Sequence, residues 1–128
     1  MGLYQDDLSR VGMLSDQALR ASRLVVDTGL HAFGWNRQKA IDFMIENTVK
    51  QEFEVIAEID RYIVWPGQAL AYKIGQLKIS ELRSKAKLAL ANKFDIRDFH
   101  DEVLKDGPLP LDRLETKISA WIDKQKLP

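Results

Sequence analysis

The sequence predicts an all-α fold, a single compact multi-helix domain of about six helices that covers residues 1–128. Apolar residues recur at intervals of three and four along six stretches, counting one short stretch, and no stretch alternates apolar and polar residues as a half-buried strand does. Hydrophobic residues make up 45% of the chain and charged residues 30%, a balance typical of globular proteins. No internal repeat, low-complexity tract or linker divides the chain.

The first helix is predicted from about Asp16 to Phe33. Ser15 suits the capping position because its hydroxyl can accept a free backbone N–H, and Leu14 and Leu19 stand where a hydrophobic staple places its two side chains. Gly34 suits the left-handed position that often ends a helix.

Two shorter helices follow. The second begins after Asn36, another capping residue, and runs to about Glu46, where Asn47 and Thr48 end it. The third covers roughly Gln51 to Val64, and the proline that comes two residues later ends it.

The fourth helix is predicted to be long, starting at Pro66 and running to about Ala91. Proline is well placed in the first turn of a helix. Gly75 in its interior costs up to about 1 kcal/mol relative to alanine, so we expect a packing reason for it. Asp95 caps a short fifth helix, and the last helix begins near Pro110.

Charge and composition exclude several classes of protein. Basic and acidic residues both number 19, so the basic excess typical of nucleic-acid binders is absent, and little self-repulsion opposes association. The chain has no cysteine, which excludes disulfides and thiolate chemistry. No apolar run is long enough to span a membrane, and the start, MGLYQDDLSR, does not resemble a signal peptide, so the compartment is left open.

A polar stripe runs along the predicted first helix. Asp16, Arg20, Arg23, Asp27 and His31 are spaced by four, three, four and four residues, which aligns them on one face. The stripe is either a solvated strip with helical ion pairs, each worth about 0.2–0.5 kcal/mol, or one wall of a cleft. Asp27 and His31 are either a surface pair or a carboxylate that orients a working imidazole.

Further polar groups follow in the third and fourth helices. Glu54, Glu58 and Arg61 share one face, and we interpret them as structural because no histidine lies nearby to complete an acid–base or metal site. Gln68 and Tyr72 are four residues apart and either present polar groups together or reflect a buried tyrosine with a hydrogen-bond partner.

The chain carries no complete catalytic or metal site of its own. It has two histidines, far apart in sequence, and lacks the H-E-x-x-H pair, the nucleophile elbow, the phosphate-binding loop and the dinucleotide fingerprint. We therefore expect no cofactor on this chain and do not expect the isolated chain to be an enzyme.

Three strings, however, closely resemble one bacterial family. They are RLVVDTGLHAFGW, ENTVKQEFEVIAEIDRYIVWPGQALAYKIG and KFDIRDFHDEVL. In order and spacing they are similar to the C-terminal region of the domain-of-unknown-function family number 885, and the resemblance covers essentially the whole chain. Full-length members resemble zinc metallopeptidases of the gluzincin type and are mostly helical.

The resemblance implies that the zinc-binding motifs precede this sequence. Zinc is then a cofactor of the full-length relatives, and the chain is truncated before the residues that bind it. Met1 is an internal methionine, an alternative start or a boundary, three alternatives that stay open.

The resemblance also implies roles for several residues, in a full-length context. His31, with Tyr72 or Tyr62, is the candidate to donate a hydrogen bond to the tetrahedral oxyanion. Arg20, Arg23 and Arg61 are candidates to hold a substrate carboxylate. Gln68 is expected to line the cleft, and the carboxylate of Asp27 to orient the imidazole of His31.

Two functions follow as hypotheses. The first is a C-terminal lobe of a metallopeptidase-like protein, which lines the cleft and acts on a peptide only in a full-length context. The second is a free-standing interaction or oligomerisation module, because a lobe without its other half exposes apolar surface. The expected partner is a second copy or the missing N-terminal catalytic portion, and not a nucleic acid or a membrane.

Overall fold

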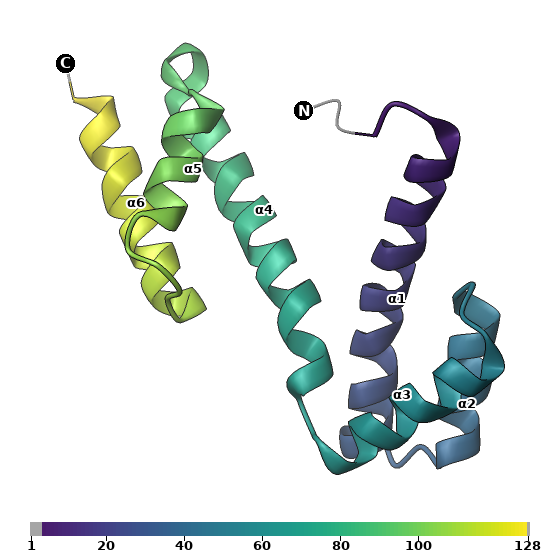
Figure 1. The fold of residues 1–128 in the computed structure, drawn as a ribbon. Helices are drawn as coiled ribbons and strands as arrows, with labels where there is room; N and C mark the ends of the chain where they lie inside the picture. Colours follow the sequence, from purple (N-terminus) through teal and green to yellow (C-terminus); the bar gives the residue numbers. More distant parts are fainter. Residues whose placement is uncertain (1–3, 128) are drawn as a thin grey trace. The chain divides into compact units, whose positions relative to one another are not determined.

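The computed structural model describes residues 4–127, so Met1 lies outside the described part. All regular structure within that range is helical, which confirms the all-α prediction (Figure 1). The six α-helices are α1 (Asp7–Ala32), α2 (Arg37–Asn47), α3 (Glu52–Val64), α4 (Ala71–Leu90), α5 (Ile96–Leu104) and α6 (Leu111–Lys126), and two short 3₁₀ helices, η1 (Gln68–Leu70) and η2 (Ala91–Lys93), flank α4.

The helices fall into two compact units. The N-terminal unit ends at Lys73 and the C-terminal unit begins at Ile74, within α4. Each unit has its own cluster of buried apolar side chains. A single domain over residues 1–128 stays a prediction.

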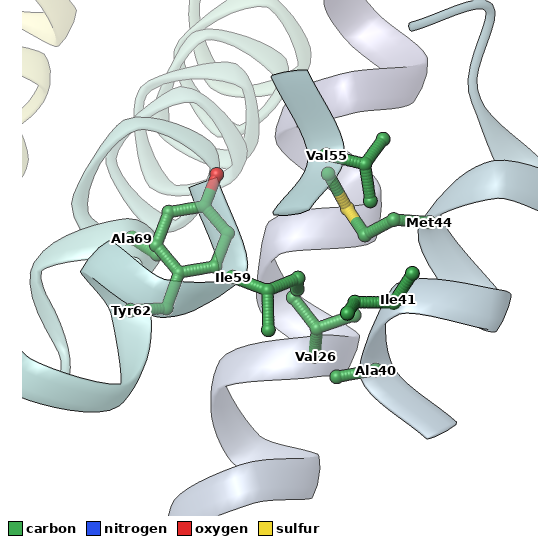
Figure 2. Packing of buried hydrophobic residues seen from close by; sticks show 8 residues of the cluster. All are labelled: Val26, Ala40, Ile41, Met44, Val55, Ile59, Tyr62 and Ala69. Carbon is green, nitrogen blue, oxygen red and sulfur yellow. The ribbon is translucent and has the colours of Figure 1, made fainter. Parts of the chain in front are cut away.

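The N-terminal unit packs α1, α2, α3 and η1 around one apolar cluster (Figure 2). Its fully buried members come from all four elements: Val26, Ala40, Ile41, Met44, Val55, Ile59, Tyr62 and Ala69. As predicted, Gly34 is left-handed at the end of α1, with φ of 66°. The turn at Gly34 lets the Trp35 N–H donate to the Gly29 carbonyl at 2.9 Å. The chain reverses here and α2 follows.

The C-terminal unit packs one face of α4 against α5 and α6. Its buried side chains are Leu82, Ala86, Leu90, Phe99, Leu114, Ile118 and Ile122. The Asp95 side chain caps α5 by accepting the Arg97 N–H at 2.8 Å, as the sequence predicts.

Two predicted helix starts are wrong. α1 begins at Asp7, with Asp6 as its cap, and the Ser15 hydroxyl lies inside the helix, donating to the Val11 carbonyl at 2.9 Å. The helix after Pro66 begins only at Ala71, because Gly67 adopts a left-handed φ of 79° and a 3₁₀ turn intervenes. A left-handed residue cannot continue a right-handed helix, so Pro66 belongs to the turn.

Candidate functional site

A cluster of polar and aromatic side chains surrounds Arg23 in the N-terminal unit. Arg23 is only 9% exposed. Its guanidinium carbon lies 5.3 Å from the centre of the Tyr62 ring and 5.2 Å from that of the Tyr72 ring, so two ring faces contribute cation–π attraction. Its Nη2 donates a long hydrogen bond of 3.4 Å to Oε1 of Gln68, and its buried Nε has no partner in the described structure.

Glu58 connects the rest of the cluster. Its Oε2 accepts hydrogen bonds from Nη2 of Arg61 at 2.6 Å and from the hydroxyl of Tyr62 at 2.5 Å. Burial alone would raise the pKa of Glu58, but these two hydrogen bonds outweigh it and hold the pKa below its ordinary value. Burial and the hydrogen bond to Glu58 raise the pKa of the Tyr62 phenol. Glu58 is therefore charged and Tyr62 protonated at neutral pH.

An open pocket of about 460 Å³ lies beside this cluster. Its walls combine charged groups with apolar side chains: Leu19, Arg23, Lys50, Phe53, Glu54, Ala57, Glu58 and Arg61. Lys50 pairs with Glu54 at 3.1 Å and Arg61 with Glu58 at 2.6 Å. Arg23 is the one cation of the pocket that has no carboxylate within 4 Å among the described residues.

Asp27 and His31 do not form the expected pair. Both oxygens of Asp27, which is 2% exposed, accept the Gly67 N–H, at 3.2 and 3.1 Å. Nε2 of His31 lies 2.9 Å from the Tyr62 carbonyl oxygen, and since a carbonyl only accepts, Nε2 carries the proton. Each of these two side chains therefore forms its hydrogen bonds with a backbone group. Among residues 4–127, no hydrogen bond joins Asp27 to His31.

The other predicted site residues divide into two groups. The cluster brings together Arg23, Arg61, Gln68, Tyr62 and Tyr72. Arg20 instead pairs with Asp16 at 3.5 Å, and its side chain is 39% exposed. The stripe on α1 is therefore a solvated strip at Arg20 and lines a pocket at Arg23. The catalytic and binding roles themselves stay predictions.

Sequence reasoning underrated Glu58 and overlooked Lys50, Phe53 and Leu19 as pocket residues. A signal for Glu58 was present, because Arg61 and Tyr62 follow it by three and four residues and so lie on the same face of α3. Lys50 likewise precedes its partner Glu54 by four residues, whereas we find no comparable local signal for Phe53 and Leu19.

The described residues do not fit a catalytic metal centre. No group of three His, Cys, Asp or Glu side chains between residues 4 and 127 lies close enough to hold a metal ion, whereas catalytic zinc takes about three protein ligands. Across the same residues, no helix combines the length and the hydropathy that crossing a bilayer requires.

Residues 1–118 match the family described as "Bacterial protein of unknown function (DUF885)". The chain belongs to the DUF885 family. This match confirms the family predicted from the three strings, while it carries no statement about peptidase activity.

A solved structure resembles this DUF885 chain closely. It is described as "the putative lipoprotein from Colwellia psychrerythraea", with a TM-score of 0.93 and 48% sequence identity. The match covers 96% of this chain but 21% of the Colwellia chain, so this chain spans about a fifth of that relative. No curated protein matches the chain significantly.

Proposed function

We propose that the chain acts as the C-terminal helical lobe of a zinc-metallopeptidase-like DUF885 protein. It contributes cleft-lining residues and is inactive alone. The observation that supports this most is the buried guanidinium of Arg23 beside an open pocket. Burying a charged group without a carboxylate partner costs free energy, and helix packing alone does not require it. A ligand-binding role explains why Arg23 is buried here.

The exposed apolar surface supports a lobe that docks on further protein. In α1, no residue from Asp7 to Ala21 is buried, although Leu8, Val11 and Leu14 are 83%, 57% and 57% exposed. A helical segment without tertiary packing is marginal in water. We propose that the remaining portion of a DUF885 protein covers this face, because the matched Colwellia chain extends well beyond the region that this chain spans.

Reconstitution tests the lobe assignment. The chain is mixed with the Colwellia protein from which the matched segment has been deleted, and the mass of the product is measured by light scattering after size exclusion. We expect a one-to-one complex that Leu14→Glu abolishes. Gln125→Glu, the same change of charge at an exposed position of α6, leaves it intact.

The controls separate docking from stability. Because Leu14 is exposed, Leu14→Glu should unfold at the same urea concentration as the unchanged chain. Absence of a complex with the unchanged chain contradicts the lobe assignment.

A second candidate is self-association through the same apolar face, which the exposed side chains of α1 also support. Light scattering of the chain alone distinguishes the two. A stable dimer that Leu14→Glu converts to a monomer favours the oligomerisation module, and a monomer at high concentration contradicts it.

A further inference from the structure

Two guanidinium groups converge on one neutral oxygen at the edge of the pocket. Oε1 of Gln68 accepts hydrogen bonds from Nη1 of Arg61 at 3.1 Å and from Nη2 of Arg23 at 3.4 Å. An amide oxygen carries only a partial charge, whereas guanidinium groups bind carboxylates most strongly. Gln68 therefore occupies a position between two cations that suits an anionic oxygen better.

The same chain shows how its arginines hold carboxylates. Arg37 binds Asp60 through Nε and Nη2 together, at 2.6 and 2.9 Å. Arg97 uses the same two atoms for Asp95, at 3.2 and 2.8 Å. In Arg23 this edge has only the long contact to Gln68 at Nη2 and no partner at Nε within the described residues.

The charge of the pocket agrees with a single anion. Its walls carry three cations, Arg23, Lys50 and Arg61, and two carboxylates, Glu54 and Glu58, which leaves one positive charge. The two carboxylates already have partners at 3.1 and 2.6 Å. One monovalent ligand would neutralise the pocket.

The apolar walls indicate what the rest of the ligand resembles. Leu19, Phe53 and Ala57 line the same pocket, and Phe53 is 73% exposed. An apolar side chain beside a carboxylate would bury surface against them.

We propose that this pocket binds the free carboxylate of a peptide or acylated amino acid with an apolar side chain. The carboxylate displaces the amide oxygen of Gln68 and binds the Nε–Nη2 edge of Arg23, with Arg61 as the second donor. The choice of a peptide as ligand rests on the proposed function, and the pocket adds the chemical class of ligand that the cleft face binds.

The probe is N-acetylphenylalanine, titrated into the 128-residue chain and followed by the Nε–Hε signals of the arginines in ¹H–¹⁵N NMR. We expect saturable shifts of the Arg23 signal at millimolar ligand. N-Acetylphenylalanine amide, which keeps the ring and lacks the charge, should leave that signal unmoved. Inorganic phosphate tests whether any oxyanion suffices, and binding as tight as that of the probe overturns the assignment to a carboxylate with an apolar side chain.

Two substitutions make the test specific. Arg23→Met, followed through the Nε–Hε signal of Arg61 in both chains, should weaken binding at least about tenfold, since it removes a charged hydrogen-bond pair. Gln68→Glu places a carboxylate between the guanidinium groups, so it should block the probe and raise the unfolding midpoint by a few degrees. Arg10→Met, on the same helix and remote from the pocket residues in sequence, should bind as the unchanged chain does.

Equal binding by the unchanged chain and Arg23→Met overturns the proposal, as does the absence of any saturable shift. Because the titration uses this chain alone, it is independent of docking. Carboxylate binding without a reconstituted complex would retain the pocket and reject the lobe.

Discussion

Replacing Gly29 by alanine should destabilise the N-terminal unit by about 1–2 kcal/mol, although alanine is the better helix former. A Cβ at this position would lie 2.5 Å from Cδ2 and 2.7 Å from Cε3 of Trp35. Both atoms belong to the fused indole ring, and the Trp35 backbone N–H donates a hydrogen bond to the carbonyl of Gly29 itself. Overpacking of this kind costs about 1–3 kcal/mol, which exceeds the gain of about 1 kcal/mol in helix propensity. Urea unfolding followed by circular dichroism measures the loss.

Two matched glycines provide the control. No heavy atom lies within 4 Å of a Cβ added at Gly12 in α1 or Gly75 in α4. Alanine there should raise the free energy of unfolding of this chain by about 0.5–1 kcal/mol. If Gly29→Ala is as stable as the unchanged chain, the packing of Trp35 on α1 is wrong.

Replacing Glu58 by alanine should cost about 2–3 kcal/mol. Tyr62 is 1% exposed, and its hydroxyl would lose its acceptor, while Arg61 would lose its ion pair. A buried donor left without a partner costs about 1–3 kcal/mol. Urea unfolding checks the loss, and Glu46→Ala, on the exposed face of α2, should change stability by less than about 0.5 kcal/mol.

The pH dependence of stability gives this prediction a second readout. The pKa of Glu58 is lower in the folded chain than its ordinary value, so its stabilising contribution is fully present above about pH 4.3 and declines as the pH falls through the folded-state pKa. Glu58→Ala should lack this part of the acid-induced loss. If the free energies of unfolding of the unchanged chain and of Glu58→Ala change in parallel with pH, the charged network around Glu58 is contradicted.

The helices were predictable where a local signal marks their ends. Asn36 and Asp95 cap α2 and α5 through hydrogen bonds to N–H groups within three residues, which the sequence displays directly. The start of α1 was missed because Gly12 lowers the helix propensity of a segment that no core residue supports. The Pro66 start was wrong because proline fits a turn as well as a first helical turn.

The site was predictable only in part, because its partners are distant in sequence or belong to the backbone. Arg23 stands out by its spacing on α1, but its contact with Gln68 joins residues 45 positions apart. Asp27 and His31 have ideal spacing for a pair, yet Asp27 binds the Gly67 N–H and His31 the Tyr62 carbonyl. Every residue carries such backbone groups, so no side-chain pattern reveals which ones a fold will bring near.

The surroundings of Gly75 are consistent with the proposed lobe. We expected a packing reason for it, and the structure supplies no neighbour for an added Cβ. In a DUF885 protein of the Colwellia chain's length, a second backbone packed on Gly75 would supply that reason.

We propose that this chain lines the cleft of a larger peptide-binding DUF885 protein, and peptide hydrolysis by such a protein tests the proposal. Peptide hydrolysis is assayed, with and without chelator, for a full-length DUF885 protein that carries this chain as its matching segment. We predict chelator-sensitive hydrolysis whose kcat/KM falls at least about tenfold in Arg23→Met. Arg113→Met, an exposed change on α6, should leave it unaltered. Equal kcat/KM for the unchanged and Arg23→Met proteins, or chelator-sensitive hydrolysis by the 128-residue chain alone, would overturn the proposed role of this chain.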